Sequence, residues 1–495
     1  MLKRLGIIVS LVVFAGCVLS AAAAAKGSSK SRGTVGARMI FGGKNSHGPM
    51  ATTARARRHR RGSKARAAAA STSVPAHIQT WAYDDCSNGG TNASSALVRG
   101  WVSYAEANCG ADGGTKAVSD CHSGGTTYCQ VIQYLDTNWI FPGSSPTWKP
   151  FNQDASESWY QHTPGSHTNR IHNGGYGGGY LINQSNPAVR DFFKNYARSN
   201  FNSDDGLMMD DQSASTGAQL YYATCGCKQT DEVGSDSALV SAHDAMSGAM
   251  THSDGQPFVQ IDNALAPNPY QPQGLSLLSR ADDVHGLISE GEPESDGTLD
   301  PYYSTLLDQI AYVATKTNSF VVPLSYSNSG ASYQQQSRRV QEATMLLGYS
   351  EGHLVDWADL EQNSDRLAVW PEEGIYPTDP VQTMAAPGGA GCLAGNGNVC
   401  STGGHNDVQV APGVYRREFG ACYDHGTAFG ACATIVNTTG HAVTVKSSWL
   451  KQSYGHQITF NGGDVQSGGT LNLAGTKFSA GSTSVASHDA VLLAR

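Results

Sequence analysis

Two adjacent carboxylates close a short apolar run near the middle of the chain. Residues 207–209 are Leu-Met-Met, and they are followed by Asp210 and Asp211. The run begins after Gly206 and is too short for a helix, so it predicts a buried β-strand with acidic residues at its carboxyl end. Because side chains alternate along a strand, Met208 and Asp210 should face the same side. The structural alternative is that either aspartate caps the next segment or accepts from a backbone amide.

A second acidic cluster follows another strand-like segment. Residues 284–290 end at Glu290, and Glu292 and Glu294 follow closely. Cleavage of a glycosidic bond needs one carboxyl group that protonates the leaving oxygen and a second that attacks the anomeric carbon or activates water. We expect Asp210 to be the nucleophile or base and Glu290 to be the acid, because the nearby carboxylates should raise its pKa. An exposed acidic loop is the alternative for Glu290.

The elements that would position these acids alternate between strands and helices. The predicted strands are residues 78–83, 129–136, 180–183, 207–209, 258–263, 284–290, 320–324 and 367–370. The predicted helices are residues 94–106, 187–201, 236–250, 302–315 and 333–349. This order favours a (β/α)8 barrel of the TIM type, whose catalytic side chains lie at the carboxyl ends of the strands. An open doubly wound sheet is the competitor, but the glycine run at 174–179 does not open a helix after a strand, as a phosphate-binding loop would.

Several strand ends carry polar or aromatic residues that could bind a sugar. They are Asp84, Asp85, Tyr134, Asp136, Asn183, Asp211, Asp262, Asn263, Glu292 and Trp357. Carboxylates and amides can hold sugar hydroxyl groups, and an indole ring such as that of Trp357 can stack on a sugar face. Aromatic residues near barrel ends also commonly serve in packing. We therefore expect a binding surface that includes these residues.

Short strand-like runs dominate the last part of the chain. After a Gly-rich linker at residues 381–408, such runs occupy 415–419, 431–437, 442–449, 457–460 and 490–494. Gly, Asn and Ser turns separate them, so residues 409–495 predict a small antiparallel β-sandwich that follows the barrel of residues 76–380. Its expected role is to pack on the barrel, and sugar binding is the alternative.

The first part of the chain has a different composition. Residues 1–83 contain 14 Lys and Arg and no acidic residue, which leaves 19 of the 33 basic residues against all 41 acidic residues in the remainder. Residues 26–75 have almost no large hydrophobic side chain and a basic cluster at 55–61, so we expect this segment to be disordered. It can be a solvated tether or can contact an anionic envelope polymer. We expect no nucleic-acid partner.

The extreme N-terminus has the layout of a signal peptide. A basic start precedes an apolar run at residues 5–19 and an alanine run that ends at 25, which predicts a secreted or periplasmic protein. A single membrane anchor is one alternative, and lipid anchoring at Cys17 is another. Removing Cys17 leaves ten of the 11 cysteines, an even number typical of disulfides in an exported chain. The first pairs that we expect are Cys392 with Cys400 and Cys422 with Cys432.

No metal site or cofactor is expected. Cys225 and Cys227 have no matching partner motif at zinc-binding spacing. His162, His167 and His172 recur at a spacing that fits no helical face, so we interpret them as residues of a solvated loop rather than as ligands. We expect a monomer.

The strand that ends at Asp210 resembles a known family. Residues 205–211, preceded by the helix that begins at Asn186 and Pro187, resemble the fourth-strand region of glycoside-hydrolase-like (β/α)8 barrels. These are related to endo-α-polygalactosaminidases and more remotely to the α-galactosidase clan. The resemblance implies carbohydrate hydrolysis, with Asp210 at the matched fourth-strand carboxylate and Glu290 at the sixth-strand position. The alternative is a non-catalytic carbohydrate-binding or cell-envelope protein on the same scaffold.

Overall fold

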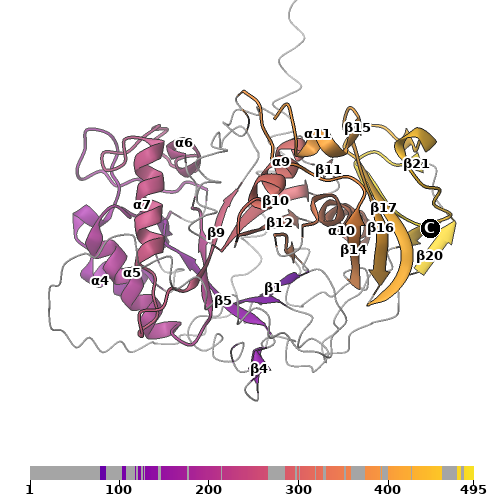
Figure 1. The fold of residues 1–495 in the computed structure, drawn as a ribbon. Helices are drawn as coiled ribbons and strands as arrows, with labels where there is room; N and C mark the ends of the chain where they lie inside the picture. Colours follow the sequence, from indigo (N-terminus) through magenta and orange to yellow (C-terminus); the bar gives the residue numbers. More distant parts are fainter. Residues whose placement is uncertain are drawn as a thin grey trace, which may run out of the picture. The chain divides into compact units, whose positions relative to one another are not determined.

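The computed structural model describes much of the chain from residue 79 onward (Figure 1). The described residues are 79–84, 103–107, 118, 121–123, 126–127, 129–142, 147–175, 178–212, 215–265, 285–295, 298–299, 302–317, 319–326, 330–350, 353–357, 374–390, 392, 400–424, 426–459, 477–480 and 484–495. All of them belong to one compact unit, residues 65–495. Within these residues, no helix combines the length and apolar character that a membrane span needs.

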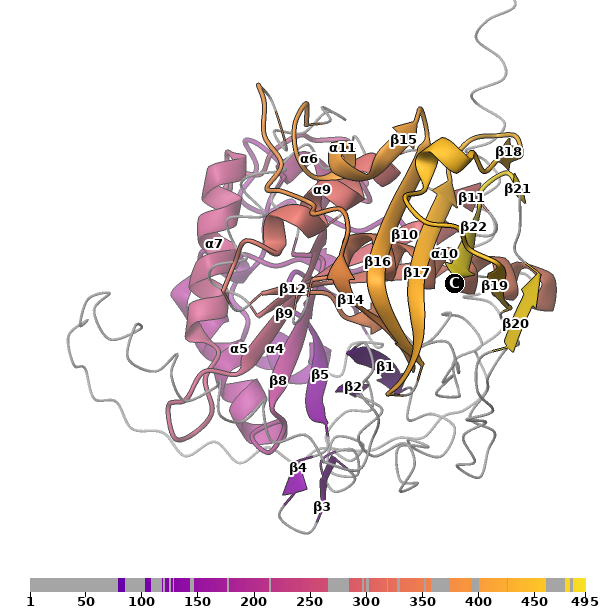
Figure 2. The ribbon, with the colours of Figure 1, turned by 45° about the vertical axis from the view of Figure 1, so that its right-hand side comes forward.

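A parallel sheet forms the centre of the described structure. Its parallel strands are β1 (Thr80–Asp84), β2 (Tyr104–Ala107), β5 (Gln130–Asp136), β8 (Gly206–Asp210), β9 (Val259–Leu265), β10 (Gly286–Ser295) and β12 (Phe320–Tyr326), paired in this order. The short strand β13 (Asp356–Trp357) pairs in parallel with β1, and a parallel bridge joins Val321 of β12 to Leu354. The sheet is therefore a nearly closed barrel of parallel strands (Figure 2).

Helix α10 (Gly330–Gly348) holds β13 against the barrel through a buried ion pair. Arg338 Nη2 lies 2.6 Å from Asp356 Oδ2, and Gln341 Nε2 donates to Asp356 Oδ1 at 3.0 Å. All three side chains are buried. A buried carboxylate needs such partners, so this network fixes the short strand where the barrel comes together.

Two of the predicted barrel elements differ from the structure in the residues that it describes. The last residues of the predicted helix 94–106 lie in β2, whose Glu106 is fully buried and accepts from Trp81 Nε1 at 2.9 Å. The predicted strand 180–183 gives β7 (Tyr180–Leu181), which pairs antiparallel with β6 (Trp139–Ile140) in a separate small sheet. Strand β2 takes the barrel position between β1 and β5, because long-range pairing overrides local periodicity. The predicted strand 367–370 lies outside the described residues.

The remaining predicted strands and helices of the barrel are confirmed. The helices are α5 (Pro187–Asn200), α7 (Asp236–Ala249), α9 (Tyr303–Val313) and α10. Helix α5 begins as its sequence predicts, since Asn186 accepts from Ala188 N and proline occupies the first turn. It packs beside α7, as Figure 1 shows, and its buried Phe192 and Phe193 contact Phe151 of α4 (Trp148–Asp154). The shorter elements here are β3 (His122–Ser123), β4 (Thr126–Thr127), η3 (Glu157–Trp159), α6 (Thr216–Gln219) and β11 (Thr298–Leu299).

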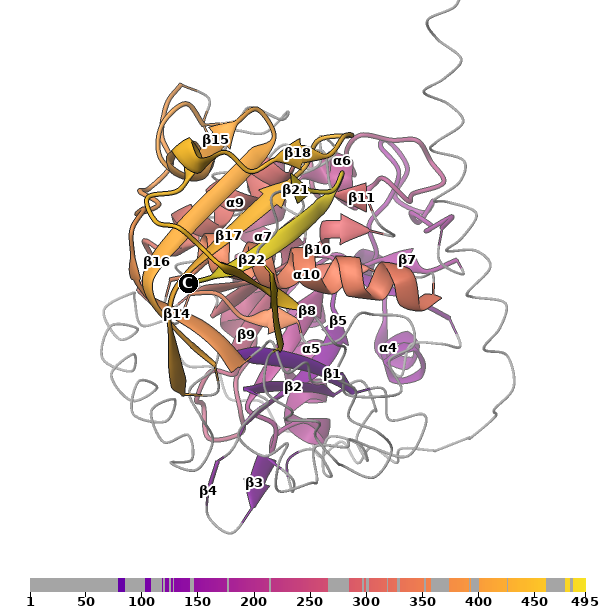
Figure 3. The same cartoon turned by 90° about the vertical axis from the view of Figure 1, so that its right-hand side faces the viewer.

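The C-terminal part forms an antiparallel sheet of seven strands. They are β14 (Ile375–Pro380), β15 (Gln409–Ala411), β16 (Val414–Asp424), β17 (Thr427–Asn437), β19 (His456–Thr459), β20 (Lys477–Ala480) and β22 (Asp489–Ala494). One face of the sheet shares a hydrophobic core with α9 and α10, and Arg339 of α10 forms an ion pair with Asp489 at 2.8 Å. Strands β16, β17 and β22 of this sheet pack against α10 (Figure 3).

The other face of this sheet carries its own apolar cluster. Val414, Ile435, Val491 and Leu493 pack there with Trp449. The short elements α11 (His405–Val408), β18 (Val443–Thr444), η6 (Ser447–Trp449) and β21 (Ser484–Val485) complete the region. Strands β18 and β21 pair with each other in a two-stranded sheet.

Four disulfides lie within the described residues. The two predicted pairs, Cys392–Cys400 and Cys422–Cys432, are confirmed, and Cys121–Cys129 and Cys225–Cys227 are also bonded. Disulfides persist in oxidising compartments, so this set indicates an extracellular or otherwise exported protein. Cys17, Cys86 and Cys109 lie outside the described residues.

Candidate active site

Strand β8 delivers Asp210 to the carboxyl end of the parallel sheet. Met208 belongs to the cluster that fills the barrel interior, whereas Leu207 and Met209 are fully buried and lie outside that cluster. Side chains alternate along the strand, so Asp210 shares the inner face with Met208, as predicted. Its side chain is half-buried at the point where the strand ends.

Both neighbouring strands donate a hydrogen bond to the Asp210 carboxylate. The hydroxyl of Tyr134, on β5, donates to Oδ2 at 2.6 Å, and Asn263 Nδ2, on β9, donates to Oδ1 at 2.8 Å. The backbone N–H of Asp211 also donates to Oδ1, at 2.9 Å. Hydrogen bonds to an ionised group are short and strong, so these three donors fix the orientation of the carboxylate and stabilise its charge.

A second carboxyl group lies beside Asp210. Asp136 is the register partner of Asp210 on β5, and its buried side chain accepts from Asn138 N and Trp139 N, both at 2.8 Å. Burial, and next the charge of Asp210, raise the pKa of Asp136 well above its ordinary value, against the opposing effect of those two N–H donors. Burial and the same carboxylates raise the pKa of Tyr134, so its hydroxyl stays a donor at neutral pH.

A turn held by side-chain amides follows Asp210. Asp211 adopts φ 55°, in the left-handed region that aspartate tolerates better than most residues, and its side chain is exposed. Asn138 Nδ2 donates to the Asp211 carbonyl at 3.0 Å, and Gln219 Nε2 donates to Asn138 Oδ1 at 2.6 Å. Gln212 Nε2 donates to the Asp210 carbonyl at 3.1 Å. These positioning amides were not among the predicted site residues, although Asn138 follows a strand-end acid closely.

The predicted binding residues divide into three groups. Tyr134, Asp136 and Asp211 lie around Asp210, as does Asn263. Asp262 and Asn183 lie elsewhere. The side chains of the last group lie outside the part of the chain that the structure describes: Asp84 of β1, Glu290 and Glu292 of β10, Trp357 of β13, and Asp85.

Asp262 and Asn183 are not part of the cluster around Asp210. Asp262 is fully buried and alternates with Asn263 on β9, so it faces away from the barrel interior. Asn183 donates to the Ser158 carbonyl at 3.0 Å and accepts from the Ser185 hydroxyl, in the turn that leads into α5. The Asn183 side chain therefore holds two protein segments together.

The predicted solvated loop around His162 is wrong for that residue. The His162 side chain is buried, with Nδ1 2.5 Å from Glu232 Oε1 and Nε2 3.0 Å from Glu157 Oε1, and Arg170 forms two hydrogen bonds with Glu157. The hydrogen bonds from Arg170 lower the pKa of Glu157 to about 2. His167, by contrast, is 89% exposed. Among the described residues, no group of three or more His, Cys, Asp or Glu side chains could hold a metal ion.

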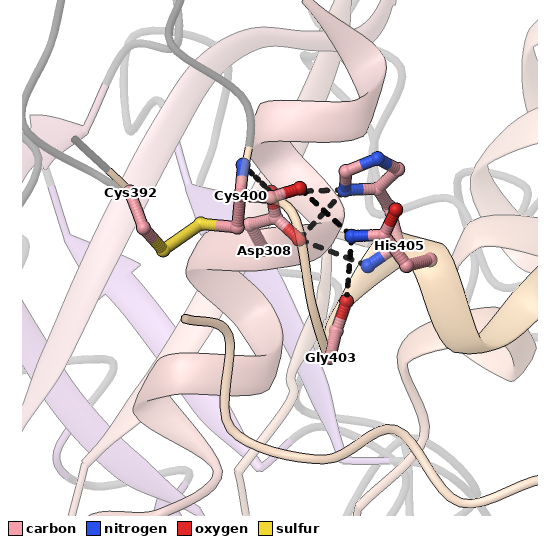
Figure 4. Close-up of a disulfide and its surroundings, with 6 residues drawn as sticks. Asp308, Cys392, Cys400, Gly403 and His405 are labelled. Atoms are coloured by element: carbon pink, nitrogen blue, oxygen red, sulfur yellow. Dashed lines mark hydrogen bonds and ion pairs between the residues drawn. A yellow bond between two sulfur atoms is a disulfide. The ribbon is translucent and has the colours of Figure 1, made fainter. Parts of the chain in front are cut away.

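A buried acid–histidine pair near the C-terminal sheet is a structural clamp. Asp308 of α9 accepts from Cys400 N at 3.2 Å and from His405 N at 2.9 Å, and His405 Nδ1 lies 2.9 Å from Asp308 Oδ1 (Figure 4). The Cys392–Cys400 disulfide closes the same segment. A Cβ on Gly404 would lie 2.0 Å from Asp308 Oδ1, so the segment packs directly on this carboxylate. Asp308 therefore serves as an anchor, and the candidate site remains at Asp210.

Comparisons with known proteins find distant structural similarity. No protein-family model and no curated protein matches the chain. The chain is similar to the glycoside hydrolase domain of PelA from Pseudomonas aeruginosa, with 10% identity and a TM-score of 0.36, over 58% of this chain and 97% of that one. It is also similar to α-galactosidase I from Mortierella vinacea, with 11% identity and a TM-score of 0.39, over 84% and 96%.

A third similar structure is a GH30 endoxylanase from Clostridium papyrosolvens, with 8% identity and a TM-score of 0.37, over 86% of this chain and 97% of that one. At these TM-scores the similarities carry no argument about activity. The geometry around Asp210 is therefore the basis for assigning a function.

Proposed function

We propose that this chain is a secreted glycoside hydrolase that cleaves a poly- or oligosaccharide. The observation that carries the proposal is the Asp210 carboxylate at the carboxyl end of a parallel barrel strand, oriented by Tyr134 and Asn263. This is the end of a parallel barrel at which enzymes place their catalytic groups. Asp210 would attack the anomeric carbon or take a proton from the attacking water.

Asp136 supports this role of Asp210. Burial and the charge of Asp210 both raise the pKa of Asp136, so a proton on Asp136 leaves less negative charge at the site. The hydroxyl of Tyr134 and the amide of Asn263 donate to the Asp210 carboxylate and would stabilise its negative charge. A nucleophile or base must carry such a charge at the pH of the reaction.

Glu290 is our proposed acid, which donates a proton to the leaving oxygen. Strand β9 separates β8 from β10, and neighbouring strands lie about 4.8 Å apart, so the backbone positions of Asp210 and Glu290 should be about 10 Å apart. Glu290 follows Ile288 of the interior cluster by two residues. Carboxyl separations of about 5 to 10 Å serve retaining and inverting hydrolysis, and a backbone spacing of this size is compatible with them.

The proposal also covers the complete fold of the chain and its cellular location. We propose a complete (β/α)8 barrel with β13 as its eighth strand, related to endo-α-polygalactosaminidase-like and α-galactosidase-clan barrels, followed by a C-terminal β-sandwich. A signal peptide would occupy residues 1–25. The basic segment at 26–75 would contact anionic envelope polymers, and the exported protein would be monomeric.

The test is an assay of the secreted protein against a panel of polysaccharides that includes galactosamine-rich and α-galactosyl polymers. Release of reducing ends by the wild type, and its loss in Asp210→Asn and Glu290→Gln, is the expected result. Activity that survives both substitutions would remove the assignment of these residues. Binding of a polymer without any cleavage would support the non-catalytic carbohydrate-binding alternative.

A further inference from the structure

Two adjacent tyrosines stand out from the other aromatic residues of the barrel region. Among the described side chains, Tyr221 and Tyr222 are the exposed large hydrophobic residues, at 48% and 40% of their surface. Their ring centroids are 4.9 Å apart and the rings are nearly perpendicular, at 79°. Other aromatic residues of the barrel region, such as Phe151 and Phe193, are fully buried. An exposed aromatic pair loses the stabilisation that burial would provide, so a contact with another molecule is a physical reason for it.

The pair lies on the segment that leaves the Asp210 strand. Chain order runs from Asp210 through the short helix α6 to buried Leu220 and then to Tyr221. Gln219, the last residue of α6, is hydrogen-bonded to Asn138, which in turn holds the Asp211 carbonyl. The tyrosines therefore belong to the loops at the carboxyl ends of the strands, where barrels bind their substrates.

The backbone around the tyrosines is held in place on both sides. Gly174 N donates to the Tyr222 carbonyl at 2.7 Å, Thr224 N donates to the His172 carbonyl at 2.9 Å, and Ala223 bridges Asn173. The Cys225–Cys227 disulfide follows directly. A rigid loop presents its rings without a large loss of conformational entropy when a ligand binds.

The glycine run of the facing loop makes room for one of the rings. A Cβ on Gly175 would lie 2.7 Å from Cδ1 of Tyr222, well inside van der Waals contact. Only glycine leaves the ring in its present position. This packing gives a structural role to part of the run at residues 174–179, for which the sequence showed no phosphate-binding context.

We infer that Tyr221 and Tyr222 form a carbohydrate-binding subsite that stacks on pyranose rings of a polysaccharide outside the cleavage point. The inference rests on the proposed function, because it assigns these rings to the same substrate. The C–H face of a pyranose is apolar and fits an aromatic ring, while the phenol hydroxyl can bond to a sugar hydroxyl. Two perpendicular rings cannot lie flat on one sugar, so the pair fits successive units of a chain.

The experiment measures binding separately from cleavage. Affinity electrophoresis would use gels that contain an α-galactosylated mannan, a xylan or an α-glucan, with every protein carrying Asp210→Asn so that the polymer stays intact. In the gel that retards this parent protein, Tyr221→Ala and Tyr222→Ala should each weaken binding about threefold to tenfold, as expected for one aromatic contact. Gly175→Ala should reproduce the effect of Tyr222→Ala by displacing its ring.

The chain offers a matched control in a second tyrosine pair. Tyr376 and Tyr423 are half-buried and stack at 4.9 Å on β14 and β16 of the C-terminal sheet, and their alanine variants should bind as the parent does. Unchanged binding by both Tyr221→Ala and Tyr222→Ala, or no retardation of the parent in any gel, would overturn the subsite. Loss of binding in these variants, with no cleavage by the wild type, would leave the subsite and refute the hydrolase.

Discussion

The two ends of β8 carry the same dipeptide in different surroundings. Asp204 and Asp205 precede the strand, and Asp210 and Asp211 close it. At the first end, Asp205 Oδ2 accepts from the backbone N–H of Val131 at 2.8 Å and lies 2.8 Å from His122 Nε2. At the second end, Asp210 accepts from side chains of both flanking strands and remains half-buried.

This difference separates a structural carboxylate from a candidate catalytic one. The hydrogen bond from the Val131 backbone N–H to Asp205 joins the start of β8 to β5. A bond of this kind stabilises the fold and needs no role in catalysis. The donors of Asp210 are a hydroxyl and an amide side chain, which hold a charge in a fixed direction at the end where barrels carry out chemistry. Two features thus distinguish a structural carboxylate from a candidate catalytic one: the groups that donate to it, and whether it lies at the amino or the carboxyl end of the strand.

Among the variants that leave Asp210 itself unchanged, Tyr134→Phe has the largest expected effect. Tyr134→Phe removes the hydroxyl that bonds to Asp210 at 2.6 Å, and we expect kcat to fall about 10-fold to 100-fold, because a hydrogen bond to a charged group contributes about 1.5–3 kcal/mol. Steady-state hydrolysis of the polysaccharide identified in the panel would measure this. The control is Tyr303→Phe, which removes a buried hydroxyl that contacts Thr344 at 2.8 Å far along the chain. Equal activity of the two variants would contradict the assignment of Tyr134 to the active site.

The next largest effect concerns Asp205, at the amino end of β8. Asp205→Ala removes the acceptor of Val131 N and the partner of His122, so the free energy of unfolding should fall by about 1.5–3 kcal/mol. The midpoint of urea denaturation measures this change. The rate of hydrolysis per folded molecule should stay within about threefold of the wild type. A stable but inactive Asp205→Ala protein would show that the amino end also takes part in the reaction.

The smallest effect is a change in how stability depends on pH. Burial, and next the charge of Asp205, raise the pKa of Asp204 to about 7 from 3.8. The folded state therefore binds a proton more tightly than the unfolded state, so the stabilisation is complete below pH 3.8 and is lost as the pH rises through about 7. Asp204→Asn should consequently raise the melting temperature at pH 8 and leave it unchanged near pH 4.

The control for this prediction is Asp191→Asn, since the Asp191 side chain is 63% exposed. Its melting temperature should follow that of the wild type at both pH values. Equal melting temperatures of Asp204→Asn and the wild type at pH 8 would contradict the buried, raised-pKa description of Asp204.

Local patterns predicted the strand and helix that deliver Asp210. Alternation along residues 207–210 placed Met208 and Asp210 on one face, and the cap at Asn186 located the start of α5. These features depend on neighbours in the sequence, so local periodicity and capping chemistry are sufficient to predict them.

Long-range partners explain what the sequence did not show. The local sequence places Glu106 at the end of a predicted helix, whereas in the structure it accepts a hydrogen bond from Trp81 inside the barrel. Asn138 and Gln219 are 81 positions apart, and the turn after Asp210 depends on their contact. Asp262 and Asn263 are adjacent on β9, so their side chains point to opposite faces of the sheet. A shift of one residue in the register of the strand would decide which of them reaches Asp210.

The two ends of β8 have different roles in this account: Asp205 at the amino end stabilises the fold, and Asp210 at the carboxyl end takes part in the reaction. The most direct measurement compares the initial rates of polysaccharide cleavage by Asp210→Asn and Asp205→Asn, each corrected for the folded fraction. We predict that Asp210→Asn loses on the order of 10³-fold or more in rate, as expected for a reacting group, while Asp205→Asn keeps a rate close to that of the wild type. Comparable rates for the two variants would contradict the claim.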